Sequence, residues 1–209
     1  TASGPRHVSL MPKTTISWPR SSLPAEQLAR LHHGPAVSPM APSRASGMTS
    51  PRASVIWRSL SPKVVSVIRF ADFEFDLVES FGQQSPVPWE KVICSWHNFA
   101  ETPDDLTARY DRMAATPAAV VKIATMANGI GDCLRTFELI EYAQGKKPVI
   151  ALAMSLAGLA TRILSLSRGA MLTFGSLRRG SESAAGQPTV ADLQQLYRIK
   201  RLDRDTEIF

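Results

Sequence analysis

From residue 71 onward, short apolar strands alternate with helices, and this alternation constrains the fold more than any other feature of the chain. The apolar segments predict strands at Phe73–Val78, Lys91–Trp96, Ala119–Thr125, Pro148–Met154 and Ala170–Leu177. The segments between and after them predict helices at Pro103–Ala115, Ile130–Ala143, Leu156–Ser167 and Val190–Arg201. Strand and helix repeats at this spacing are typical of parallel βα units, so the sequence predicts an α/β fold.

Start and stop signals support the helices. Thr102 is the expected N-cap of the first, followed by Pro103 at the first helical position. Gly145 is placed to end the second helix. Thr189 is the expected cap of the last helix, with Asp192 three residues further on.

The first 70 residues have a different character. They hold nine lysines and arginines, one acid and nine of the 15 prolines, whereas residues 71–209 hold 15 basic and 17 acidic residues. The overall charge of +6 therefore describes only the first third of the chain, and nucleic-acid binding is not expected of the remainder. Proline, like charge and the absence of an apolar period predict a disordered or aberrant segment at residues 1–70.

The cysteines and the apolar runs indicate the compartment. Cys94 and Cys133 lie in apolar or helical patterns without metal-ligand spacing, which favours reduced thiols in the cytoplasm. The longest apolar run, Pro148–Ala160, is too short to span a bilayer, and the N-terminal residues lack the apolar core of a signal peptide. We therefore expect a cytoplasmic protein without a membrane partner.

Polar residues at strand ends are the candidate functional residues, because the site of an α/β barrel lies at the carboxyl ends of its strands. His97 directly follows a predicted strand, Lys122 lies inside the apolar segment AVVKIAT, and Arg162 follows the strand PVIALAM. A Gly-flanked polar loop at residues 178–187 follows the last strand and has the composition of a lid. Each has a plainer reading alone: a surface histidine, a lysine reaching water, a solvated arginine and a connecting loop.

Lys122 carries the sharpest chemical implication. Burying an ammonium group is costly, so an apolar surrounding favours the neutral amine. A neutral amine is the nucleophile that attacks a carbonyl carbon to form an imine. An arginine is suited to bind a substrate carboxylate with both oxygens. Because the four features follow different strands of one βα series, we expect them to converge on one pocket.

Their order and local motifs resemble the type I 3-dehydroquinate dehydratases. SWHNFAETPDDL resembles the segment of the catalytic histidine, and AVVKIATMAN resembles the strand of the Schiff-base lysine. PVIALAMSLAGLATRIL resembles the strand and loop with the carboxylate-binding arginine, and LTFGSLRRGSESAAGQPT resembles the last strand and its lid. The resemblance covers residues 71–202 and implies a (β/α)8 TIM barrel in which the first three βα units are unrecognisable. It implies catalytic roles for His97 and Lys122 and substrate contacts for Met154, Arg162, Ser183, Ala184 and Gln187.

The resemblance further implies dehydration of the small molecule 3-dehydroquinate to 3-dehydroshikimate in the shikimate pathway. The reaction runs through a covalent imine on Lys122, with no metal or other cofactor, and family members often form homodimers. The chain departs from the family pattern at Asn98, where aspartate is usual, which predicts an altered hydrogen bond to the histidine. Ala185 stands where proline is usual, which predicts a looser lid.

Two regions leave alternatives open. The family's early Glu-x-Arg, Arg and Glu-Gly-Gly motifs are not found in residues 1–70, which are divergent, an extension replacing the first strands, or read in a wrong frame. Residues 203–209 form a C-terminal tail or linker, whose DTEIF resembles the start of a shikimate dehydrogenase domain in fused proteins. The alternative functions are another Schiff-base lyase or aldolase, and an impaired barrel acting as a binding or structural module.

Overall fold

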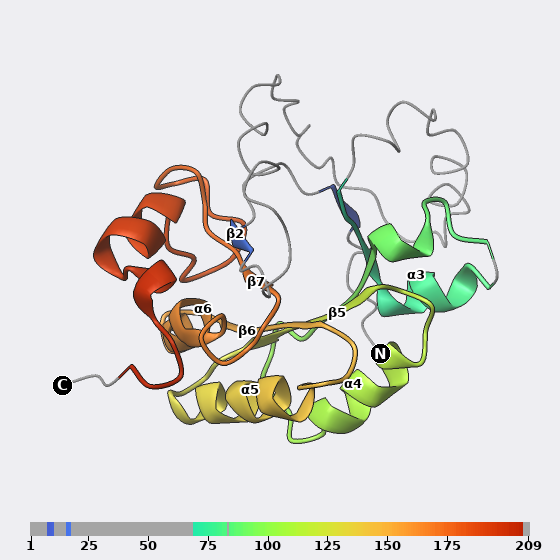
Figure 1. Cartoon of the computed structure of the whole chain (residues 1–209), viewed down its shortest axis with the longest axis horizontal. Helices are drawn as coiled ribbons and strands as arrows, with labels where there is room; N and C mark the ends of the chain where they lie inside the picture. The colour runs from blue at the N-terminus through green and yellow to red at the C-terminus, as the bar shows by residue number, and fades with distance from the viewer. Residues whose placement is uncertain (1–7, 11–15, 18–68, 83, 207–209) are drawn as a thin grey trace.

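A computed structural model describes residues 8–10, 16–17, 69–82 and 84–206 of the chain. Within these ranges the chain forms an α/β layer structure, with a mainly parallel sheet covered by helices (Figure 1). The predicted α/β class is therefore confirmed. Most of residues 1–70 lies outside the described ranges, as do Glu207–Phe209 of the DTEIF segment.

The main sheet has five strands in the order β1-β3-β4-β5-β6. Its parallel part consists of β3 (Ala71–Glu74), β4 (Val92–His97), β5 (Val120–Met126) and β6 (Val149–Met154). β1 (Val8–Leu10) pairs antiparallel with β3, and β2 (Ile16–Ser17) pairs antiparallel with β7 (Leu172–Thr173). The two short N-terminal strands thus lie against the first and last of the described C-terminal strands.

Helices connect the parallel strands and pack on one side of the sheet. They are α3 (Phe75–Ser80), α4 (Leu106–Ala114), α5 (Gly131–Tyr142) and α6 (Leu159–Leu164). Figure 1 shows α4 and α5 running beneath β5 and β6. Short helical turns η2 (Trp89–Lys91), η3 (Asp192–Leu196) and η4 (Ile199–Arg201) complete the described structure.

The strands separate two cores, because alternate side chains point to opposite faces. One face of the sheet packs against the helices through residues that include Cys94, Val121 and Ile123. The opposite face buries a smaller layer made of Ile93, Val120, Ile150 and Leu172. This second face would line the interior of a barrel, and it also carries the polar residues described below.

Several predicted boundaries were wrong. The predicted strand Phe73–Val78 is a strand only through Glu74 and continues as α3, and the strand predicted at Ala170–Leu177 is reduced to β7. Thr102 does not cap α4; its hydroxyl donates to the Thr125 hydroxyl and the Met126 carbonyl, and the helix begins at Leu106. Tertiary hydrogen bonds thus outweighed the local capping signal.

Other local predictions were confirmed. Gly145 has a φ of 74° just beyond the end of α5, a conformation that side chains disfavour and glycine accepts. Thr189 and Asp192 bond reciprocally: each side-chain oxygen accepts the other residue's backbone N–H. The helix that they begin is nevertheless shorter than predicted, because Arg198 takes a left-handed φ of 50° between η3 and η4.

Within the described ranges, none of the helices combines the length and the apolar character needed to cross a membrane. The same residues contain no cluster of three or more histidine, cysteine or acidic side chains arranged to hold a metal ion.

Candidate active site

A row of polar side chains crosses the sheet on the face turned away from the helices. Glu74 on β3, Ser95 on β4 and Lys122 on β5 are register partners, so their side chains share one face. Asp72 and His97 lie two residues away from this row along their strands and therefore point to the same face. Three neighbouring strands thus place five polar groups together.

Lys122 is held in this row by a buried carboxylate. Its ammonium nitrogen Nζ lies 2.6 Å from Oδ2 of Asp72, and the two side chains are 11% and 3% exposed. The same nitrogen lies 5.2 Å from the ring centroid of Phe174, just beyond β7. Lys122 therefore does not reach out to water from an edge strand. Asp72 and Phe174 hold its amine on the face of the sheet that is turned away from the helices.

His97 is oriented by Glu74. The imidazole Nδ1 is hydrogen-bonded to Oε1 of Glu74, and the Phe99 ring stacks on the imidazole at an interplanar angle of 7°. This pairing fixes which ring nitrogen faces the carboxylate and leaves Nε2 for proton transfer. Asn98 serves another purpose, because its side-chain oxygen accepts the backbone N–H groups of Ala100 and Glu101.

Replacing Glu74 with glutamine should therefore slow turnover without unfolding the chain. Glutamine keeps the size of the side chain but removes the carboxylate that orients the imidazole. We expect kcat to fall at least about tenfold, by analogy with other carboxylate–histidine pairs. Steady-state kinetics measure the effect, with circular dichroism to establish folding, and an unchanged kcat in the folded variant would contradict this role.

Arg162 lies inside the structure rather than on a helix surface. The residue is 1% exposed, and burial lowers the pKa of its guanidinium to about 10, so the group stays charged at neutral pH. Within the described part of the chain, Nε and Nη2 are buried without a hydrogen-bond partner. The backbone carbonyl of Arg162 accepts the Thr173 hydroxyl at 2.9 Å, which ties α6 to β7. A buried, unsatisfied guanidinium is suited to an anionic ligand.

The loop that follows β7 is fastened to the end of β6. Oε1 of Gln187 accepts the backbone N–H of Ser183 at 2.8 Å and its hydroxyl at 3.1 Å. The backbone N–H of Ser155 donates to the carbonyl of Ala185 at 3.0 Å. Gly186 lies so close that a Cβ atom there would approach the Ser155 carbonyl carbon to 2.4 Å. The predicted lid residues Ser183 and Gln187 therefore form one hydrogen-bonded loop.

Phe174 connects this loop region to the lysine. Its ring packs in a small apolar cluster with Met154 and Ala184, and the same ring faces Nζ of Lys122. Ala124 and Leu152 complete the buried part of the cluster. Of the predicted site residues, Lys122 lies over the Phe174 ring, and Met154 and Ala184 belong to the same apolar cluster as that ring. The register of β4 and β5 places His97 on the same face as Lys122.

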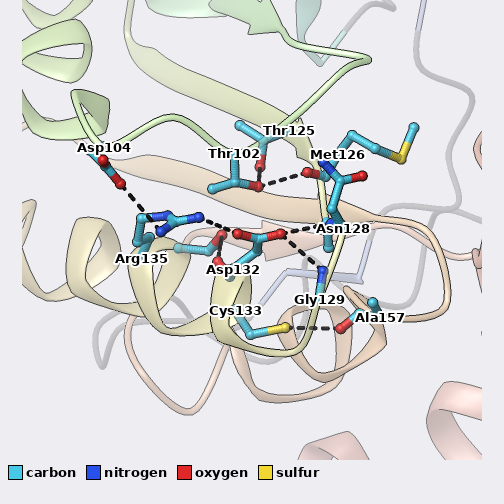
Figure 2. Close-up of polar contacts among 12 residues, drawn as sticks. Thr102, Asp104, Thr125, Met126, Asn128, Gly129, Asp132, Cys133, Arg135 and Ala157 are labelled. Carbon is cyan, nitrogen blue, oxygen red and sulfur yellow. Dashed lines mark hydrogen bonds and ion pairs between the residues drawn. The ribbon is translucent and has the colours of Figure 1, made fainter.

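A polar network locks the strand ends together (Figure 2). The Asn128 side chain donates to the carbonyl of Ala100, and Arg135 pairs with both Asp104 and Asp132. The carboxylate of Asp132 accepts the backbone N–H groups of Asn128 and Gly129 at 2.7 and 3.1 Å. These bonds join the loops that follow β4 and β5, and so fix His97 relative to Lys122.

Asp132 gives this network a pH dependence. Burial acts to raise the pKa of its carboxyl, but the two backbone donors and Arg135 oppose this effect and leave the pKa below its ordinary value. Because the folded pKa is the lower one, the stabilisation is present above the unfolded pKa and is lost as the pH falls through the folded pKa.

We expect Asp132→Ala to lower the free energy of unfolding by about 2 kcal/mol at neutral pH, since charged hydrogen bonds are lost. The difference from the unsubstituted chain should shrink below about pH 4. Denaturant titrations at neutral and acidic pH measure it, and a pH-independent difference would contradict the assignment.

Sequence reasoning missed four residues of this site. Asp72, Glu74, Ser95 and Phe174 lie on or next to the predicted strands, but none interrupts an apolar run as visibly as Lys122. The available signal was the acidic alternation in ADFEF, which places Asp72 and Glu74 on one face of a strand. Asp72 Oδ1 and Ser95 Oγ are buried without hydrogen-bond partners among the described residues, as are two nitrogens of Arg162.

A buried lysine and a carboxylate-oriented histidine share one face of a parallel sheet, and an arginine with unsatisfied buried nitrogens lies on α6. These are groups whose chemistry suits imine formation with an anionic carbonyl compound. The sequence model of the type I 3-dehydroquinase family matches residues 56–204, and the chain belongs to that family. The match begins 15 residues before Ala71, the first residue of the segment that carries the family motifs.

Individual relatives agree with this membership. A 3-dehydroquinate dehydratase of Syntrophobacter fumaroxidans is 32% identical over 169 residues, covering 79% of this chain and 72% of that protein. A chloroplastic bifunctional 3-dehydroquinate dehydratase/shikimate dehydrogenase of Arabidopsis thaliana is 44% identical over 136 residues, covering 64% of this chain and 22% of that protein.

Solved structures support the barrel fold. A type I 3-dehydroquinate dehydratase of Clostridium difficile superposes with a TM-score of 0.58 at 24% identity, covering 75% of this chain and 65% of that one. The predicted TIM-barrel class is confirmed by this likeness, although the described residues themselves form an open arrangement of strands. The chain spans about half the length, or less, of the first curated relatives that it matches.

Proposed function

We propose that this chain catalyses the dehydration of 3-dehydroquinate to 3-dehydroshikimate through an imine on Lys122. The observation that carries the proposal is the pairing of two neighbouring strands: β5 presents the buried amine of Lys122, and β4 presents His97, held by Glu74, on the same face. Membership of the type I 3-dehydroquinase family supports the choice of substrate.

The reaction begins with attack of the Lys122 amine on the C3 ketone of the substrate, and water leaves as the imine forms. The protonated imine accepts the electron pair that is left when Nε2 of His97 removes a proton from C2. The same imidazolium then donates this proton to the departing C1 hydroxyl, so that water is lost and a conjugated imine remains. Hydrolysis of that imine releases the product and restores the amine.

The remaining residues bind and enclose the substrate. Arg162 receives the substrate carboxylate through the nitrogens that lack partners within the described chain. The loop of Ser183, Ala184 and Gln187 covers the site from the β7 side, and Met154 supplies an apolar wall. This division assigns no step to a metal ion or a nucleotide; the covalent group is the side chain of Lys122.

Arg162→Ala should weaken substrate binding more than it slows the chemical step. A buried charge pair contributes about 2–5 kcal/mol when one partner is truncated, which corresponds to a KM increase of roughly thirtyfold or more. Steady-state kinetics with 3-dehydroquinate measure the effect, with circular dichroism to establish folding. Arg168→Ala, which alters an exposed pair with Glu141, is the control and should leave KM unchanged.

The direct test of the proposed activity is a spectrophotometric assay for the conjugated enone of 3-dehydroshikimate. The chain is expected to raise its absorbance when 3-dehydroquinate is added. The runner-up is an aldolase that uses the same lysine, since Lys122 alone suits either reaction. Cleavage of aldol substrates without any dehydration of 3-dehydroquinate would favour that alternative, but the glutamate-held His97 and the family match favour the dehydratase.

A further inference from the structure

Asp72 is a buried acid for which the mechanism above has no use. It lies on β3, is 2% exposed as a whole residue, and contacts Nζ of Lys122 through Oδ2 at 2.6 Å. Its second oxygen, Oδ1, is buried and has no hydrogen-bond partner within the described chain. A carboxylate that is only structural would normally have both oxygens satisfied.

The pair poses a chemical problem for imine formation. A carboxylate 2.6 Å from an amine favours the ammonium form, and an ammonium group cannot attack a ketone. The same geometry allows the ammonium group to lose a proton, because the proton needs to move only from Nζ to Oδ2 across one existing hydrogen bond. Glu74, the other acid on β3, is engaged with His97 instead.

We propose that Asp72 is the proton carrier for imine formation at Lys122 and then the counter-ion of the protonated imine. Oδ2 takes one proton from the ammonium group, and the freed amine nitrogen bonds to the ketone carbon as the carbon–oxygen π bond breaks. The carboxylic acid returns this proton to that oxygen, which becomes the hydroxyl of a carbinolamine. Asp72 then carries a second proton from the nitrogen to this hydroxyl, which leaves as water while the carbon–nitrogen double bond forms. The balance is ammonium plus ketone giving protonated imine plus water, with Asp72 again ionised.

This inference rests on the proposed function, because it assigns a residue to the same imine. It predicts that Asp72→Asn makes Lys122 more reactive toward acetylation and yet slower to form the imine with 3-dehydroquinate. Without the Asp72 carboxylate, Nζ of Lys122 is no longer held in a buried ion pair, so acetylation of Lys122 by acetic anhydride at neutral pH should increase about tenfold or more. Without the proton carrier, the rate at which borohydride traps the 3-dehydroquinate imine should fall about tenfold or more.

Two further variants serve as controls. Asp72→Glu keeps the charge and should restore the protection from acetylation and part of the trapping rate, which also serves if the asparagine variant does not fold. Asp111→Asn removes an exposed acid on α4 and should change neither quantity. Peptide mass analysis of Lys122 reads both reactions in each protein.

The outcomes separate this inference from the proposed function. Trapping by Asp72→Asn at the rate of the unsubstituted chain or faster would overturn the role of Asp72, because the carboxylate would then only hold the lysine protonated. A trapping rate no higher in Asp72→Glu than in Asp72→Asn would likewise overturn it. No trapped imine even in the unsubstituted chain would contradict the proposed function itself, while the acetylation comparison would still measure the ion pair.

Discussion

Lys122→Ala is expected to abolish covalent capture of 3-dehydroquinate and to lower kcat by about 10⁴-fold or more, as is typical when a nucleophile is removed. The imine supplies the electron sink for the C2 carbanion, and no other described lysine lies on this face of the sheet beside Asp72. The change truncates a partly apolar side chain and leaves Asp72 buried without its counter-ion, so the variant should also lose stability.

Lys122→Met separates chemistry from stability in this experiment, because methionine keeps most of the side-chain volume while removing the amine. Both variants should show the same loss of turnover despite different thermal midpoints. Substantial turnover by either variant, or a borohydride-stable adduct at another lysine, would contradict the role of Lys122. Lys147→Met, at a lysine that hydrogen-bonds the Thr116 carbonyl outside the site, should retain the adduct.

His97→Ala should lower kcat by about 10²- to 10⁴-fold while leaving KM close to its original value, since proton transfer accounts for factors of this size. Imine formation does not require this imidazole as its proton carrier, so the variant should still accumulate a trapped adduct with 3-dehydroquinate. Rapid-mixing kinetics and borohydride trapping together measure the two steps.

The contrast with Lys122→Ala is diagnostic. A His97 variant that turns over at nearly the original rate would contradict its acid/base role. A folded His97 variant that forms no adduct at all would place the histidine in the first step instead of the second. His97→Gln offers a milder change that keeps a polar side chain of similar reach toward Glu74.

The sequence predicted the parts of this site that break an apolar pattern. A lysine inside AVVKIAT and a histidine at a strand end stand out because both are costly or unusual there. Lys122 lies within β5 as predicted, and His97, predicted to follow its strand, is the last residue of β4. The burial of Arg162 was not predictable from its helical surroundings, because it depends on the packing of α6 against β6 and α5. The roles of Asp72 and Glu74 could not be predicted from the sequence, because they depend on the strand register that places Asp72 beside Lys122 and Glu74 beside His97.

The fold shows the same division between local and tertiary information. Gly145 and the Thr189–Asp192 pair act within a few residues and were predicted correctly. The Thr102 hydroxyl suited a helix cap but binds the end of β5, and the apolar segment after Glu74 turns into a helix. The disordered or aberrant character of residues 1–70, the homodimer and the fused dehydrogenase domain remain predictions.

The most direct test of the account is intact-mass analysis of the chain after incubation with 3-dehydroquinate and borohydride, followed by peptide mapping. The account predicts one added mass, equal to the reduced substrate- or product-derived adduct, on the peptide that contains Lys122. A chain that is folded by circular dichroism and carries no adduct, or carries it elsewhere, would contradict the assignment of Lys122 as the imine-forming residue.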